Sequence, residues 1–98
     1  MQALEAFIRL GQQLAGRAAS ANFQAVTARS SWTRADVETE TEHAIERMKI
    51  GARDLVVARG ADPDDMYWRM AWIAMEIRYR DTMANLLRIS GLRGGSSV

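Results

Sequence analysis

Two short turn-forming segments, at residues 30–33 and 62–65, divide this chain of 98 residues into three stretches of helix-favouring residues. Ala, Leu, Met, Arg and Glu are frequent in the stretches between them, and no alternating run of β-branched and aromatic residues occurs. Short connections place successive helices antiparallel. We therefore predict an all-α fold with three long antiparallel amphipathic helices, at about residues 2–28, 34–59 and 63–90.

Local signals mark the ends of these helices. Thr33 followed by Asp36 has the spacing of a capping box, in which each side chain accepts a backbone N–H of the other residue. Gly60 stands where a left-handed residue ends a helix. Asp62 followed by Pro63 predicts the start of the third helix, because Asp is a favoured N-cap and Pro suits the first helical position.

The composition indicates one helical domain in an aqueous setting. It is 48% hydrophobic and 26% charged, which fits a folded domain at residues 1–91, and the polar, glycine-rich segment 92–98 is expected to be a flexible tail. The chain has no cysteine, so disulfides and thiolate metal sites are excluded. No secretory signal is visible, and the most apolar stretch is too short and too charged for a transmembrane segment. We expect a cytoplasmic protein.

The first helix carries a seam of apolar and small residues with alternating spacings of three and four. That spacing predicts a helix lying nearly parallel to its neighbour, and the small side chains predict a close approach. The seam contains Leu4, Phe7, Gly11, Leu14, Ala18, Ala21 and Ala25.

The third helix is apolar on two opposed sides, which is more than a three-helix monomer buries. One stripe contains Trp68, Trp72, Met75, Tyr79, Met83 and Leu86. The opposite stripe contains Met66, Met70, Ile73, Ile77, Ala84 and Leu87. The second helix repeats the pattern more weakly, with Ile50 and Val57 pointing away from its main stripe of Val37, Thr41, Ala44, Ile45, Met48, Ala52 and Leu55.

Surplus apolar surface predicts assembly. Several large apolar side chains left in water would limit solubility. We therefore expect a non-enzymatic subunit that completes its bundle as a homo-oligomer or on a helical protein partner. The predicted interface residues are Trp68, Trp72, Met75, Tyr79, Met83, Leu86, Met66, Met70, Ile73, Ile77, Ile50 and Val57.

A metal site is the alternative hypothesis. Glu40 and His43 have the Glu-x-x-His spacing, and Glu76 could add a carboxylate from the neighbouring helix. The arrangement resembles half of the site of ferritin-like metal-carboxylate proteins, which implies a dimer with iron or another divalent metal as cofactor. Arg80, four residues on, is a competing partner for Glu76, and we expect this structural ion pair in preference to a catalytic role. In the leading interpretation the protein has no cofactor.

A nucleic-acid-binding adaptor is a further alternative, with Arg69, Arg78 and Arg80 interleaved among aromatic residues. The net charge of only +1 argues against a nucleic-acid partner. Trp32, in the first connection, is expected to cover the bundle end or to anchor an interface.

Common enzyme patterns are missing. The single histidine, His43, has no serine and aspartate arranged around it as in a triad, and the Gly94–Gly95 pair lies in the tail rather than in a phosphate-binding loop. The residues favour a protein without enzymatic activity.

Overall fold

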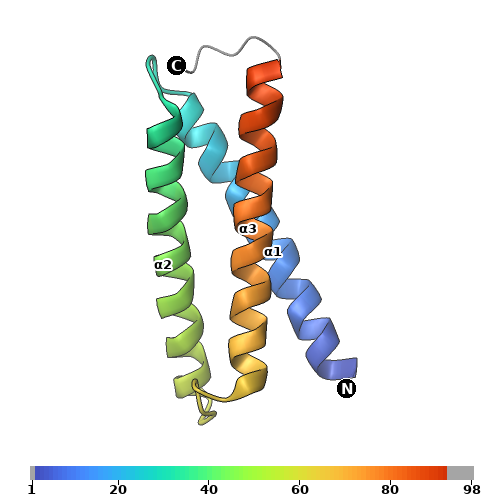
Figure 1. Cartoon of the computed structure of the whole chain (residues 1–98). Helices are drawn as coiled ribbons and strands as arrows, with labels where there is room; N and C mark the ends of the chain where they lie inside the picture. Colours follow the sequence, from blue (N-terminus) through green and yellow to red (C-terminus); the bar gives the residue numbers. More distant parts are fainter. Residues whose placement is uncertain (1, 93–98) are drawn as a thin grey trace.

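The computed structural model describes residues 2–92, with side-chain surroundings defined for 5–91, and over this range it contains three helices and no strand. They are α1 (Gln2–Thr27), α2 (Arg34–Ala58) and α3 (Met66–Leu92). α2 and α3 run antiparallel side by side, and α1 crosses behind α3 at an oblique angle (Figure 1). The all-α fold is confirmed. Of the predicted tail, Leu92 belongs to α3, and 93–98 lie outside the described residues.

α2 has the two ends that the sequence predicts. The backbone N–H of Asp36 donates to Thr33 Oγ1 at 3.2 Å, and that of Thr33 donates to Asp36 Oδ2 at 2.9 Å, which completes the capping box. At the other end Gly60 has φ +76°. The N–H of Gly60 and of Ala61 then reach back to the carbonyls of Val57 and Val56. This is the Schellman pattern, and it satisfies carbonyl groups that the helix leaves open.

α3 begins at Met66 rather than at Pro63. The carboxylate of Asp62 accepts the N–H of Asp64 at 2.9 Å, and its carbonyl accepts the N–H of Asp65 at 3.1 Å. These bonds form a separate turn before the helix. Asp65 then caps α3 by accepting the N–H of Tyr67 at 2.8 Å. The prediction of Asp62 as the cap was wrong because its side chain closes the turn.

α1 packs mainly on α3, through a row of small residues that shares Gly11 with the predicted seam but otherwise departs from it. Gly11, Ala15 and Ala19 are buried, whereas Leu14 is 51% exposed against 1% for Ala15. Spacing by four follows the ridges that pack at a steep crossing angle, whereas the predicted heptad seam suits nearly parallel helices. The oblique course of α1 in Figure 1 agrees with this spacing of four positions between buried residues. The predicted nearly parallel course of this helix was therefore wrong, and of its predicted seam Gly11 is buried whereas Leu14 is exposed.

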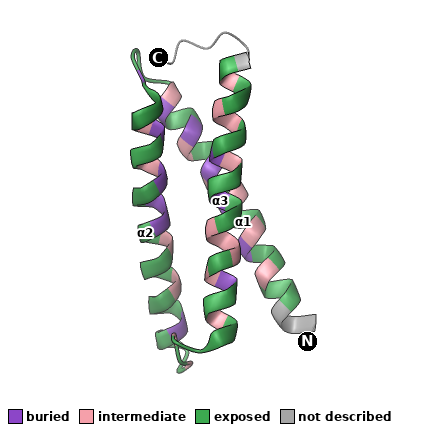
Figure 2. Cartoon of the chain, viewed as in Figure 1, coloured by how far each residue is buried: buried purple, intermediate pink, exposed green. Residues whose placement is uncertain are grey.

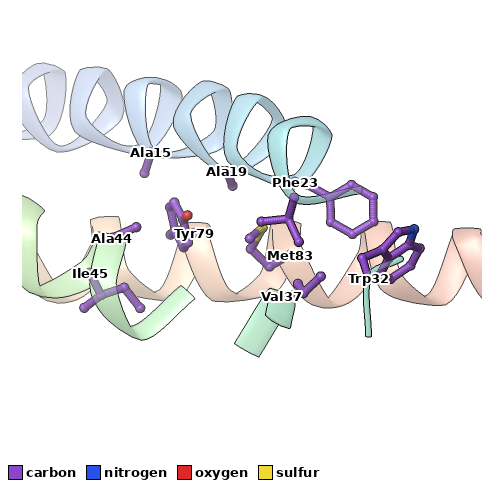
Figure 3. Packing of buried hydrophobic residues seen from close by; sticks show 10 residues of the cluster. Ala15, Ala19, Phe23, Trp32, Val37, Ala44, Ile45, Tyr79 and Met83 are labelled. Carbon is purple, nitrogen blue, oxygen red and sulfur yellow. The ribbon is translucent and has the colours of Figure 1, made fainter. Parts of the chain in front are cut away.

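The core lies where the three helices meet. Tyr79 and Met83 of α3 face Ala19 and Phe23 of α1, and Val37 of α2 closes the other side (Figure 3). The main stripe of α2 is confirmed at its first positions. Near its end, however, Val56 is buried and Leu55 is exposed.

Trp32 covers one end of the core. Its ring is 9% exposed and packs edge-on against Phe23, with ring centroids 6.2 Å apart. Of the two predicted roles, cover of the bundle end and interface anchor, the contacts support the first.

Candidate functional site

The two stripes of α3 have different surroundings. Tyr79 is 0% exposed and Met83 2%, because both lie against α1 and α2 inside the chain's own core. The remaining members of this inner stripe are half-buried: Trp68, Trp72, Met75 and Leu86. Of the predicted interface residues, these six face the chain's own helices.

The opposite side of α3 has no helix packed on it. We call Met66, Met70, Ile73 and Ile77 the outer stripe. Met66 is 71% exposed, Ile73 56%, Ile77 54% and Met70 48%. Exposed segments recur along the visible side of α3 in Figure 2. In the same half of the molecule, Ile50 and Val57 of α2 are also exposed. The predicted second stripe therefore lies on the surface, apart from Leu87, which packs against the core.

An ion-pair network fixes α2 against α3 beside the outer stripe. Lys49 Nζ lies 3.1 Å from Glu76 Oε1, and Arg80 contacts Glu76 at 3.1 Å and Glu42 at 2.6 Å. The Lys49 ammonium, with help from Arg80, lowers the pKa of Glu76 below its usual 4.5, against a smaller effect of burial. The hydrogen bonds from Arg80 likewise lower the pKa of Glu42. The predicted Glu76–Arg80 pair is confirmed. The contact between Lys49 and Glu76 could not be predicted from spacing within one helix, because the two residues lie on different helices.

The candidate metal residues do not converge within this chain. Glu40 is paired with Arg47 at 2.8 Å, Glu76 belongs to the ion-pair network, and His43 is exposed. Over the part of the chain that the structure describes, no three metal-binding side chains gather at one point. Both carboxylates therefore have a cationic partner already in place.

The three candidate nucleic-acid residues lie in different settings. Arg80 is held by Glu42 and Glu76. Arg69 is exposed, and Arg78 lies beside α1 at an open, shallow hollow that Arg17 also lines. The sequence analysis omitted Arg17, because only the crossing of α1 over α3 brings it near Arg78.

An apolar cleft opens where α1 diverges from α2. It has a volume of about 60 Å³, and its lining includes Phe7 of α1, Leu55 of α2 and Trp72 and Met75 of α3. Phe7 stacks edge-on against Trp68, with ring centroids 5.0 Å apart. No sequence signal could locate this cleft, because it depends on the angle of α1.

Comparison with models of protein families, with curated proteins and with solved structures gives no match. Among the described residues, no helix combines the length and the apolarity that crossing a bilayer requires.

Proposed function

We propose that this chain is a non-enzymatic assembly subunit that binds a second copy of itself, or a helical partner, through the outer stripe of α3. The observation that carries the proposal is the contrast between the two sides of one helix. Tyr79 and Met83 are enclosed, whereas Ile73 and Ile77, one turn apart, are each more than half exposed.

The energetics favour covering this stripe. Burying a large apolar side chain contributes about 1.5–3 kcal/mol, so completing the burial of a half-exposed one contributes about 1 kcal/mol. The outer stripe offers four such side chains on consecutive turns of one rigid helix. Met66 and Met70 add adaptable surface, since an unbranched thioether fits many shapes. Together these features are typical of a helix-packing surface.

The shape of the molecule supports the same conclusion. It measures 47 × 23 × 16 Å, so three helices form a thin body in which each keeps one side in solvent. Exposed Leu10 and Leu14 of α1, and exposed Ile50 and Val57 of α2, show that the apolar surplus is not limited to α3. A further helix packed on the bundle would lower this exposure.

The proposal is tested by placing a charge in the stripe. We expect Ile77→Glu to reduce the molar mass measured by light scattering to that of one chain, because a carboxylate in an apolar interface loses its hydration. Asn85→Glu is the matched control, since Asn85 is an exposed residue of the same helix outside the stripe. It should keep the mass of the unaltered protein.

Circular dichroism of both variants should show the helical content of the unaltered protein, so that a change in mass is not due to unfolding. A mass equal to the unaltered protein for Ile77→Glu, and also for Ile73→Glu, would reject the outer stripe as the interface.

A further inference from the structure

The outer stripe of α3 has the same spacing when it is read in either direction along the helix. Its residues Met66, Met70, Ile73 and Ile77 are separated by four, three and four positions. Alternation of three and four is typical of a helix that packs at a small angle on its neighbour. Because the series is unchanged on reversal, a second copy of α3 running in the opposite direction presents the same spacing of apolar side chains.

The side chains of the stripe also complement one another on reversal. An antiparallel copy centred on the stripe sets Met66 against Ile77 of the partner subunit, and Met70 against Ile73 of the partner subunit. Each layer then contains one unbranched methionine, which adapts its shape, and one β-branched isoleucine, which is stiff. All four side chains are exposed in the single chain, so every layer of such a pair covers apolar surface on both copies.

The charged residues beside the stripe distinguish the two possible directions of the copy. Arg69 and Glu76 lie on the flank that faces α2, and Asp81 lies on the other flank. A two-fold axis perpendicular to α3 sets each flank against the same flank of the copy, so an antiparallel pair brings Arg69 beside Glu76 of the partner subunit, twice by symmetry. A parallel pair sets opposite flanks together and brings Glu76 beside Asp81 of the partner subunit, which is a repulsion.

Arg80 occupies the position at which the stripe would continue beyond Ile77. In a parallel pair it would meet Arg80 of the partner subunit. In the antiparallel pair it lies at the level of the partner's turn 62–65, which contains three aspartates. The guanidinium group of Arg80 donates three hydrogen bonds to Glu42 and Glu76 within its own chain, and it has further N–H groups to donate to an acid of the copy. This position also favours the antiparallel direction.

We propose that the partner of the outer stripe is a second copy of this chain, with its α3 antiparallel and the two-fold axis between Met70 and Ile73. This inference rests on the proposed function, since it specifies the partner and the geometry of the same surface. The overlap covers the half of the chain near the turn 62–65, where the exposed large apolar residues of α2 and α3 lie, apart from Ile89. The other half, with its closed core, extends beyond the overlap.

The direction of the copy is tested by the distance between two spin labels, measured by double electron–electron resonance. The chain has no cysteine, so Asn85→Cys provides one labelled site in each chain, at an exposed residue outside the stripe. Residue 85 lies about 13 positions from the axis, so two labels in the antiparallel pair are separated by about 40 Å along the helices. In a parallel pair they would be separated by about 10–20 Å, close to the distance between packed helices.

The contact of Arg69 with the copy is tested by reversing its charge. Arg69→Glu replaces two attractions to Glu76 of the partner subunit by two repulsions, so the dissociation constant of the pair should rise at least about fivefold at low salt. Arg88→Glu is the matched control, because Arg88 is also an exposed arginine of α3 but lies beyond the overlap. Its dissociation constant should stay within about twofold of the unaltered value. Sedimentation equilibrium measures both, and circular dichroism checks that both remain helical.

Three results would overturn the proposal. The first is a short label distance in a protein with twice the mass of one chain, which would indicate a parallel pair. The second is an equal effect of Arg69→Glu and Arg88→Glu, which would place Arg69 outside the contact. The third is the mass of one chain for the unaltered protein, which would leave a different helical protein as the partner. Failure of the proposed function is distinct, because it appears as a dimer mass that Ile77→Glu and Ile73→Glu leave unchanged.

Discussion

The side-chain amide of Asn22 in α1 donates a hydrogen bond of 2.8 Å to the hydroxyl oxygen of Tyr79 in α3. Tyr79 is 0% exposed, and burial raises the pKa of its phenol above 10.0. A buried tyrosine hydroxyl needs a polar partner, and here the partner comes from the helix that crosses it. The bond therefore joins α1, at the point where it crosses α3, to a fully buried residue of the core.

Removal of this bond should destabilise the fold. We expect Tyr79→Phe to lower the free energy of unfolding by about 0.5–1.5 kcal/mol, the net contribution of a typical hydrogen bond. Tyr67→Phe is the matched control, because Tyr67 is 49% exposed, and it should change the free energy little. Urea unfolding at one fixed protein concentration measures both. Equal effects of the two substitutions would contradict the role of the Asn22–Tyr79 bond.

Two glycines in helix interiors should respond differently to replacement by alanine. Gly51 has no atom within 4 Å of a built Cβ, so Gly51→Ala should stabilise the protein by about 0.8–1 kcal/mol through helix propensity. At Gly11 the same Cβ would lie 2.9 Å from Met75 Cγ. Because Met75 must shift, Gly11→Ala should be less stable than Gly51→Ala by about 1 kcal/mol or more. Thermal or urea unfolding compares them, and equal stabilisation would argue against close packing of α1 on α3.

Acid should weaken the contact between α2 and α3. The pKa of Glu76 is lowered from 4.5 in the folded state, chiefly by Lys49. The carboxylate therefore stabilises the fold above pH 4.5 and loses this effect as the pH falls through the folded-state pKa. Since the pair is partly exposed, Glu76→Gln should cost no more than about 1 kcal/mol at neutral pH.

The Glu76→Gln variant should also show a smaller loss of stability below pH 4.5 than the unaltered protein. Glu46→Gln is the control, since Glu46 is exposed and no ion pair involves it in the described part of the chain. Unfolding by urea across this pH range is the measurement. If the profiles of the two variants coincide, the ion pair does not contribute.

Local chemistry made the ends of α2 predictable. The capping box of Thr33 and the left-handed Gly60 depend on residues within a few positions of each other, so spacing alone identifies them. The face of α1 was not predictable in the same way. Leu14 carries a stronger apolar signal than Ala15, yet Ala15 is the buried residue, because a steep crossing needs small side chains.

The candidate surfaces differ in the same respect, since one depends on the pattern of a single helix and the others depend on how two helices cross. The outer stripe of α3 follows from the periodicity of one helix, and its exposure agrees with the prediction from sequence. The shallow hollow beside Arg17 and Arg78 and the cleft lined by Trp72 depend on how α1 crosses α3. A pattern within one helix contains no information on that angle until the partner helix is known.

The most direct test of the assembly proposal is sedimentation equilibrium of the unaltered chain over a range of concentrations up to tens of micromolar. One chain has a mass of 11.0 kDa. If the outer stripe binds a second copy, the average mass should rise with concentration towards a fixed multiple of that value. A mass that remains at 11.0 kDa at every concentration, in a protein that does not aggregate, would contradict self-association.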